Sequence, residues 1–259
     1  MKIAALQMVS TTSVEKNLDA ARILLARAAR EGAELAILPE YFCIMGRSDR
    51  DKLAIAEAPG SGPIQAMLAE TAREHRLWLV AGTLPLQSGE EGRAMNANLV
   101  FSPIGERVAR YDNGREQYDE GRTLKAGNEP VAFDAAGLRV GLSVCYDLRF
   151  PELYRALMQP PCDLLCVPSA FTHPTGLAHW EVLLRARAIE NQCYVAAAAQ
   201  GGRHENGRRT FGHSLIVDPW GEVVAMLPEG EGIVAAEVRR ERLAEVRAQI
   251  PALEHRRGL

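Results

Sequence analysis

Apolar residues recur along this chain in two kinds of pattern, and the order of these patterns repeats once. Short runs that are apolar throughout predict buried strands, whereas apolar positions three or four residues apart predict amphipathic helices. In the first half, strands are predicted over residues 2–8, 35–40, 77–82, 97–102 and 106–111. One helix is predicted after the capping box Thr12-Ser-Val-Glu15, and another over about 63–74.

The second half gives the same order of strand, helix, strand, helix and several further strands. Strands are predicted over residues 131–133, 139–145, 163–168, 194–199, 214–218, 223–227 and 233–238. Helices are predicted from Pro151 and over about 179–191, and Pro219-Trp-Gly221 is a predicted hairpin turn. The charged tail 239–259 has a helical stretch to Gln249, and either a solvated face or an arm against a partner subunit fits it.

Two similar halves with strands apolar on both faces predict an α/β protein built as a four-layer α-β-β-α sandwich. This layering buries both faces of each sheet and the apolar stripe of each helix. No Gly-, Ser- or Pro-rich linker separates the halves, so residues 1–259 are expected to form a single domain.

Composition narrows the function classes. The apolar fraction of 47% is ample for a core, and a net charge of −3 gives no reason to expect nucleic acid or an anionic membrane as a partner. No apolar run is long enough to span a membrane, and the first residues lack a signal-peptide cleavage site. Five cysteines at irregular spacing indicate a reducing cytoplasm. Cys162 and Cys166 lie in an apolar strand pattern without zinc-like ligand spacing, so burial is favoured over a metal site.

Cys145 ends a predicted strand just before a turn into a helix. Active sites of α/β proteins open at such strand ends, and the backbone N–H of Tyr146 is placed there to stabilise an oxyanion. A lone cysteine is more often a small buried apolar residue. Glu40, however, ends a second apolar strand, and a buried carboxylate is costly without a task or a partner. Cys145 and Glu40 together make a nucleophile and a general base.

These residues carry a resemblance to the nitrilase superfamily of carbon–nitrogen hydrolases. The base motif is Leu38-Pro-Glu40-Tyr, and the nucleophile motif is Gly141-Leu-Ser-Val-Cys145-Tyr-Asp-Leu-Arg-Phe-Pro-Glu152. Three further segments are similar to the Nit branch, and within it to the deaminated glutathione amidases. They are Pro168-Ser-Ala-Phe-Thr172, Ala178-His-Trp-Glu-Val-Leu-Leu-Arg-Ala-Arg-Ala-Ile-Glu190 and Gly212-His-Ser-Leu-Ile-Val-Asp-Pro-Trp-Gly221.

The resemblance implies the αββα fold, amide hydrolysis without a cofactor, and a small ω-amido acid such as deaminated glutathione as substrate. It also implies homodimers or larger homo-oligomers. The accessory glutamate of the family matches Glu120, which without the resemblance is best explained as an exposed loop carboxylate.

One part of the family pattern is missing. The family has a catalytic lysine after the strand that ends near Tyr111, but here Asp112 is followed directly by Asn113. None of the four lysines occupies that position, and Arg110 or Arg115 would not copy a compact ammonium. Three explanations are open: the printed sequence omits a segment, the protein carries a real deletion, or it is a relative that has lost activity. Because every other motif is intact, we favour an amidase scaffold whose printed sequence is short by one segment.

Other residues are candidates for contact with the substrate. Arg149 is suited to pair with a substrate carboxylate, although an ion pair with Glu152 or Glu181 fits it equally well. Phe171 and Thr172 follow the strand beside Cys145 and are expected to line the pocket.

Two other classes of function are considered. A non-catalytic binding module on the same scaffold is favoured by the absent lysine. A nucleotide-binding protein is disfavoured, because Gly201-Gly-Arg-His-Glu-Asn-Gly207 has neither the spacing nor the lysine of a phosphate loop.

Overall fold

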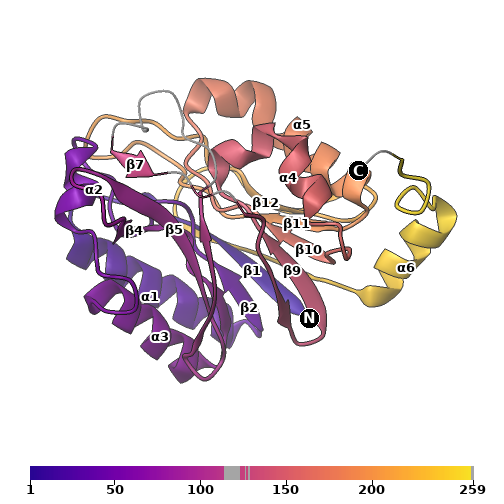
Figure 1. The fold of residues 1–259 in the computed structure, drawn as a ribbon, viewed down its shortest axis with the longest axis horizontal. Coiled ribbons are helices and arrows are strands. Elements are labelled where there is room, and N and C mark those ends of the chain that lie inside the picture. Colours follow the sequence, from indigo (N-terminus) through magenta and orange to yellow (C-terminus); the bar gives the residue numbers. More distant parts are fainter. Residues whose placement is uncertain (114–122, 126, 128, 258–259) are drawn as a thin grey trace.

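The computed structural model of the chain describes residues 1–113, 123–125, 127 and 129–257. Within them lie two sheets, with helices on the outer side of each (Figure 1). The helices are α1 (Val14–Arg30), α2 (Arg50–Ala54), α3 (Pro63–His75), the 3-10 helix η2 (Cys145–Arg149), α4 (Pro151–Ala156), α5 (His173–Asn191) and α6 (Arg240–Gln249).

The first sheet has the strand order β14-β1-β2-β3-β5-β4, and β6 and β7 also pair with β5. Strands β1 to β3 are parallel, and β5 is antiparallel to β3. The strands are β1 (Lys2–Gln7), β2 (Leu35–Ile37), β3 (Trp78–Val80), β4 (Leu84–Gln87), β5 (Ala94–Phe101), β6 (Arg107–Asp112), β7 (Leu124–Lys125) and β14 (Gly232–Glu237).

The second sheet has the order β13-β12-β11-β10-β9-β8 and repeats this plan. Strands β9 to β11 are parallel, and β12 is antiparallel to β11. The strands are β8 (Ala132–Ala135), β9 (Leu138–Leu142), β10 (Leu164–Cys166), β11 (Tyr194–Ala197), β12 (Ser214–Val217) and β13 (Val223–Leu227). The repeat in the apolar pattern is therefore a repeat of sheet topology.

Alternate residues of β1 show how the layers pack. Ile3 belongs to a buried cluster that spans both sheets and includes Trp180 of α5. Ala4 belongs to a second cluster, with Leu25 of α1 and Leu68 of α3. The first sheet thus faces α1 and α3 on one side and the second sheet on the other, while α4 and α5 cover the second sheet (Figure 1). The predicted α-β-β-α fold class is confirmed.

Several predicted boundaries are wrong in an instructive way. Strand β2 ends at Ile37 and β9 ends at Leu142, so Glu40 and Cys145 each lie three residues beyond a strand. Apolar residues continue past both strand ends, because these connecting segments are buried between the layers. A buried connection has the same apolar pattern as a strand, so the pattern alone does not distinguish them.

The helices also start elsewhere than predicted. The N-cap of α1 is Ser13 rather than Thr12, and its side chain accepts the Lys16 N–H at 3.4 Å. Helix α5 begins at His173, about six residues earlier than predicted, because Pro174 is tolerated in a first helical turn. The turn at Pro219-Trp-Gly221 is confirmed, since it joins the antiparallel strands β12 and β13.

Candidate active site

Cys145 lies at the sharp turn between β9 and α4. Its φ is 43°, in the left-handed region, where a residue other than glycine is uncommon and often has a functional role. Its backbone N–H donates to the Pro168 carbonyl at 2.9 Å, which fixes the turn against the segment after β10. The thiol-bearing residue is buried and opens η2, whose next N–H belongs to Tyr146.

A buried carboxylate stabilises this turn. Oδ2 of Asp147 accepts the Val144 N–H at 2.9 Å and the Tyr111 hydroxyl at 2.7 Å. Tyr111 belongs to β6 of the first sheet, so this hydrogen bond ties the turn at Cys145 to the other half of the chain. Sequence reasoning missed Asp147, although it lies two residues after Cys145.

Two more side chains position the turn. The Tyr154 hydroxyl donates to Ser143 Oγ at 2.9 Å, and Nη2 of the buried Arg187 donates to the Leu148 carbonyl at 2.7 Å. Burial raises the pKa of Tyr154, so its hydroxyl stays protonated and remains a donor. Arg187 also pairs with Glu190 at 3.0 Å, and its side chain is only 6% exposed.

Glu40 lies on the buried segment that follows β2. Its Oε1 accepts a hydrogen bond from Nδ2 of Asn96 at 3.0 Å, and both side chains are buried. The next residue, Tyr41, has φ 55°, and its N–H donates to Thr83 Oγ1 at 2.9 Å. Asn96 was not predicted. Its one sequence signal is an amide within an apolar run that becomes β5.

Hydrogen bonds link the segments that carry Glu40 and Cys145. Nε2 of Gln200 donates to the Glu40 carbonyl at 3.1 Å, and the Gln200 N–H donates to the Ser169 carbonyl at 2.9 Å. Ser169 follows Pro168, whose carbonyl holds the Cys145 N–H. Two segments far apart in the sequence are therefore fastened to one another between the two sheets.

The side chains of three predicted substrate contacts lie together. The Arg149 guanidinium lies 5.3 Å from the ring centroid of Phe171 and 5.7 Å from that of Tyr146. Its Nη1 donates to Nδ1 of His179 at 3.1 Å, a partner that the sequence did not suggest. Thr172 is the exposed N-cap residue of α5, and its Oγ1 is hydrogen-bonded to Thr175 Oγ1 at 2.8 Å. Glu120, the predicted accessory glutamate, lies outside the described residues, and so does Arg115, which was set aside as a substitute for the missing lysine.

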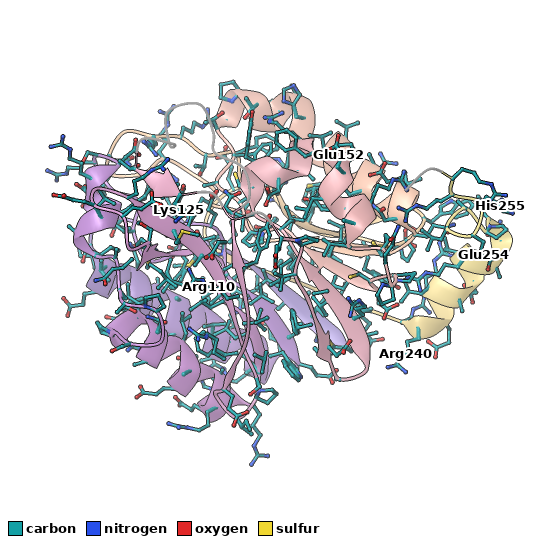
Figure 2. The ribbon with its side chains drawn as sticks, in the orientation of Figure 1. Arg110, Lys125, Glu152, Arg240, Glu254 and His255 are labelled. Atoms are coloured by element: carbon teal, nitrogen blue, oxygen red, sulfur yellow. The ribbon has the colours of Figure 1, made fainter. Side chains whose placement is uncertain are left out.

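At the position of the missing lysine, Asp112 ends β6. The N–H of the next residue, Asn113, donates to the Asn96 carbonyl at 3.1 Å. Arg110 and Lys125, both labelled in Figure 2, are paired with carboxylates. Arg110 Nε lies 2.8 Å from Asp112 Oδ1, and Lys125 Nζ lies 2.6 Å from Glu90 Oε1.

Lys52 is a cation that the sequence analysis left unused. Its Nζ lies 3.7 Å above the centroid of the Tyr41 ring, and the side chain is 5% exposed. Its Nζ is 3.8 Å from Asp49 Oδ1. The Tyr41 hydroxyl in turn contacts Nδ2 of Asn96 at 3.4 Å. Lys52 therefore stands near the Glu40 segment rather than at the position of the family's lysine.

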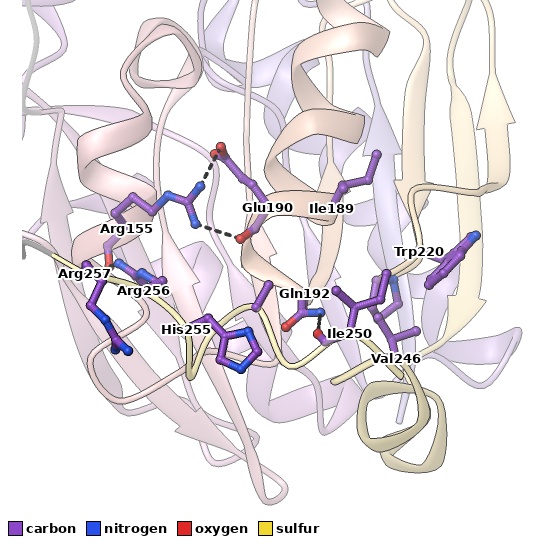
Figure 3. A pocket seen from close by; sticks show the side chains of 12 residues that line it. Arg155, Ile189, Glu190, Gln192, Trp220, Val246, Ile250, His255, Arg256 and Arg257 are labelled. Atoms are coloured by element: carbon purple, nitrogen blue, oxygen red, sulfur yellow. Dashed lines mark hydrogen bonds and ion pairs between the residues drawn. The ribbon is translucent and has the colours of Figure 1, made fainter. Parts of the chain in front are cut away.

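A cavity of about 780 Å³ lies apart from these residues, between the end of α5, α6 and the tail (Figure 3). It is lined by Arg155, Glu190, Trp220, Ile250 and neighbouring residues, none of which is a predicted site residue. In the described part of the chain, no group of three His, Cys, Asp or Glu side chains is arranged to hold a metal ion. No described helix is both long and apolar enough to cross a membrane.

Comparison with known proteins decides the family. The model of the carbon–nitrogen hydrolase family matches residues 2–248. The chain belongs to this family. Its resemblance to the Nit branch of the nitrilase superfamily is confirmed as well, and carbon–nitrogen bond hydrolysis is the activity of the family.

The relatives are similar over nearly the whole chain. A deaminated glutathione amidase of Synechocystis is 42% identical over 265 residues, covering 98% of this chain and 97% of its own. The structure of Saccharomyces cerevisiae Nit3, a member of branch 10 of the nitrilase superfamily, is 29% identical with a TM-score of 0.90, covering 97% of this chain and 94% of its own.

A third similar protein has a reactive cysteine. An amidase variant from Nesterenkonia sp. AN1, with acrylamide added to its active-site cysteine, is 27% identical with a TM-score of 0.83. The match covers 97% of this chain and 98% of that protein. A cysteine in the catalytic position is therefore a feature of the family that this chain matches.

Proposed function

We propose that this protein hydrolyses the amide of a small ω-amido acid, similar to deaminated glutathione, through a thioester on Cys145. The relatives named as deaminated glutathione amidases support the substrate class. The carrying observation is the buried Glu40 carboxylate, held by Asn96, on a segment that is hydrogen-bonded to the one that positions Cys145.

In the first step, Glu40 takes the proton of the Cys145 thiol, and the thiolate adds to the amide carbon. The N–H of Tyr146 is one donor to the resulting oxyanion. The carbon–nitrogen bond then breaks, and the leaving nitrogen takes the proton from Glu40 to depart as ammonia. In the second step, Glu40 takes a proton from water, whose oxygen attacks the thioester, and the free acid and thiol are released. No cofactor takes part.

The remaining assignments extend this mechanism. Glu120, which lies outside the described residues, is assigned as the accessory glutamate that the family resemblance implies. Arg149, with the rings of Phe171 and Tyr146 beside it, is the cation for the substrate's free carboxylate, and Thr172 borders the same region. We also propose that the protein is cytoplasmic and forms a homodimer or a larger homo-oligomer.

A second candidate is a nitrilase-fold binding protein with impaired catalysis. It is favoured by the direct junction of Asp112 and Asn113, where the family has its lysine. Loss of one oxyanion donor typically costs on the order of 100- to 1000-fold in turnover. The absence of the lysine is thus expected to affect the rate far more than the fold.

Ammonia release from a panel of small ω-amides discriminates between the two candidates. The proposed function predicts turnover, together with an acyl adduct visible by intact mass. Cys145→Ala is expected to lose the adduct and keep the fold, and Glu40→Gln is expected to fold but to fail in both steps. A folded wild-type protein without turnover supports the binding protein. An adduct that persists in Cys145→Ala, or wild-type rates in Glu40→Gln, would contradict the assigned roles.

A further inference from the structure

Gln200 is a fully buried polar residue that directly follows the apolar run around β11. We propose that it is a positioning residue for the general base: it holds the Glu40 segment in register with the Cys145 turn. This inference rests on the proposed function only in taking Glu40 as the base of Cys145.

Both the oxygen and the nitrogen of the Gln200 side-chain amide form hydrogen bonds. Its Oε1 accepts the Ser10 N–H at 3.0 Å, while Nε2 donates to Ser10 Oγ at 2.7 Å and to the Glu40 carbonyl at 3.1 Å. Exchanging the amide oxygen and nitrogen would put an acceptor against the Glu40 carbonyl and a donor against the Ser10 N–H. The orientation of the side chain is therefore fixed by three contacts.

Ser10 forms a further hydrogen bond to the segment that carries Glu40. Its Oγ donates to the Phe42 carbonyl at 2.9 Å, so Gln200 and Ser10 together bind the carbonyls on either side of Tyr41. Ser10 is itself fixed, because Nδ1 of His204 donates to its carbonyl at 2.8 Å. The base segment is thus anchored from the second half of the chain.

The backbone of Gln200 contacts the segment that supports Cys145. Its N–H donates to the Ser169 carbonyl, and the neighbouring Pro168 carbonyl accepts the Cys145 N–H, both at 2.9 Å. The residue therefore contacts the base segment with its side chain and the nucleophile's supporting segment with its main chain.

This anchor matters because no sheet ladder holds the base. Strand β2 ends three residues before Glu40, and Tyr41 has a left-handed φ of 55°. Proton transfer needs heavy atoms about 2.6–3.2 Å apart, and a displacement of about 1 Å can cost on the order of 100-fold in rate. Losing the Gln200 amide is therefore expected to slow the steps that need Glu40, with little change in substrate affinity.

The test uses Gln200→Met, which keeps the length of the side chain and removes its hydrogen bonds. Gln192→Met is the matched control, since Gln192 is also buried but donates to the Ile250 carbonyl beside α6. The readout is the rate at which iodoacetamide alkylates Cys145, followed by intact mass. It requires no turnover.

We expect Gln200→Met to slow alkylation at least tenfold and Gln192→Met to leave it within twofold of wild type. In a Glu40→Gln background, Gln200→Met should cause no further loss, because the residue acts through Glu40. For a productive amide substrate, kcat should fall while KM stays within about twofold.

Alkylation at the wild-type rate in folded Gln200→Met overturns the inference, and so do losses that multiply in the double variant. If Gln200→Met does not fold, Gln200→Glu replaces it. That variant keeps an acceptor for the Ser10 N–H but has no donor for Ser10 Oγ or for the Glu40 carbonyl. It must show slower alkylation, with its pH midpoint moved upward by the added negative charge. An unchanged rate and midpoint overturn the inference. If Cys145 is alkylated at the wild-type rate in Glu40→Gln alone, the base role of Glu40 in the proposed function fails instead.

Discussion

The hydrogen bond between the Tyr111 hydroxyl and the Asp147 carboxylate gives a quantitative test of how the two halves are held together at the Cys145 turn. The oxygen–oxygen distance is 2.7 Å, and both residues are buried. Tyr111→Phe keeps the ring and removes this one donor. Because the acceptor is a carboxylate, the loss in unfolding free energy should be about 1.5–3 kcal/mol, or between about 10- and 150-fold in the unfolding constant.

Tyr154→Phe is the matched control. The Tyr154 hydroxyl is also buried, but it donates to the neutral Ser143 Oγ at 2.9 Å. A neutral pair contributes about 0.5–1.5 kcal/mol, so this variant should lose less stability. Urea unfolding followed by circular dichroism and tryptophan fluorescence measures both, and agreement of the two probes checks that unfolding is two-state. Equal losses, or a larger loss in Tyr154→Phe, would refute the assignment of a charge-assisted bond at Asp147.

Three further outcomes are expected. At pH 8, iodoacetamide should label one thiol in the native chain and none in Cys145→Ala. The reason is that burial raises the pKa of Cys43 to about 12 and also raises the pKa values of Cys162, Cys166 and Cys193. A second rapid label in intact-mass spectra would contradict this. Arg149→Met should raise KM about tenfold for an anionic ω-amido acid and leave it unchanged for an uncharged amide, and equal effects on both would argue against a carboxylate contact. Burial lowers the pKa of His204, so the unfolded chain binds protons more readily and stability should fall as the pH drops below about 6.5. Urea midpoints should fall more steeply for wild type than for His204→Asn, and parallel decreases would count against this linkage.

Much of the architecture was predictable because it depends on local pattern. Strands that are apolar on both faces can be buried only between layers, and the repeated order of elements predicted two similar sheets. The errors at the strand ends have one common cause. Residues near Glu40 and Cys145 are apolar because they are buried connections, and burial of this kind cannot be told from a strand by periodicity alone.

The family motifs predicted the chemistry at Cys145 and Glu40 because those motifs are contiguous in sequence. The residues around them were not predictable in the same way. Asn96 is 56 positions from Glu40, and Gln200 is 160 positions from it. The only sequence signal of either residue is that it is polar and lies within or next to an apolar run.

The sequence by itself therefore determined the layered fold and the family, and it predicted Cys145 as nucleophile and Glu40 as base, since these follow from apolar periodicity and short motifs. Only the tertiary structure decided what holds them. Tyr111 against Asp147, and Gln200 between the Glu40 and Cys145 segments, are contacts across the two sheets, and Asn96 against Glu40 joins the region after β2 to β5 within the first sheet. The partners are far apart in the sequence and meet only in the folded chain, so no local pattern encodes the pairing.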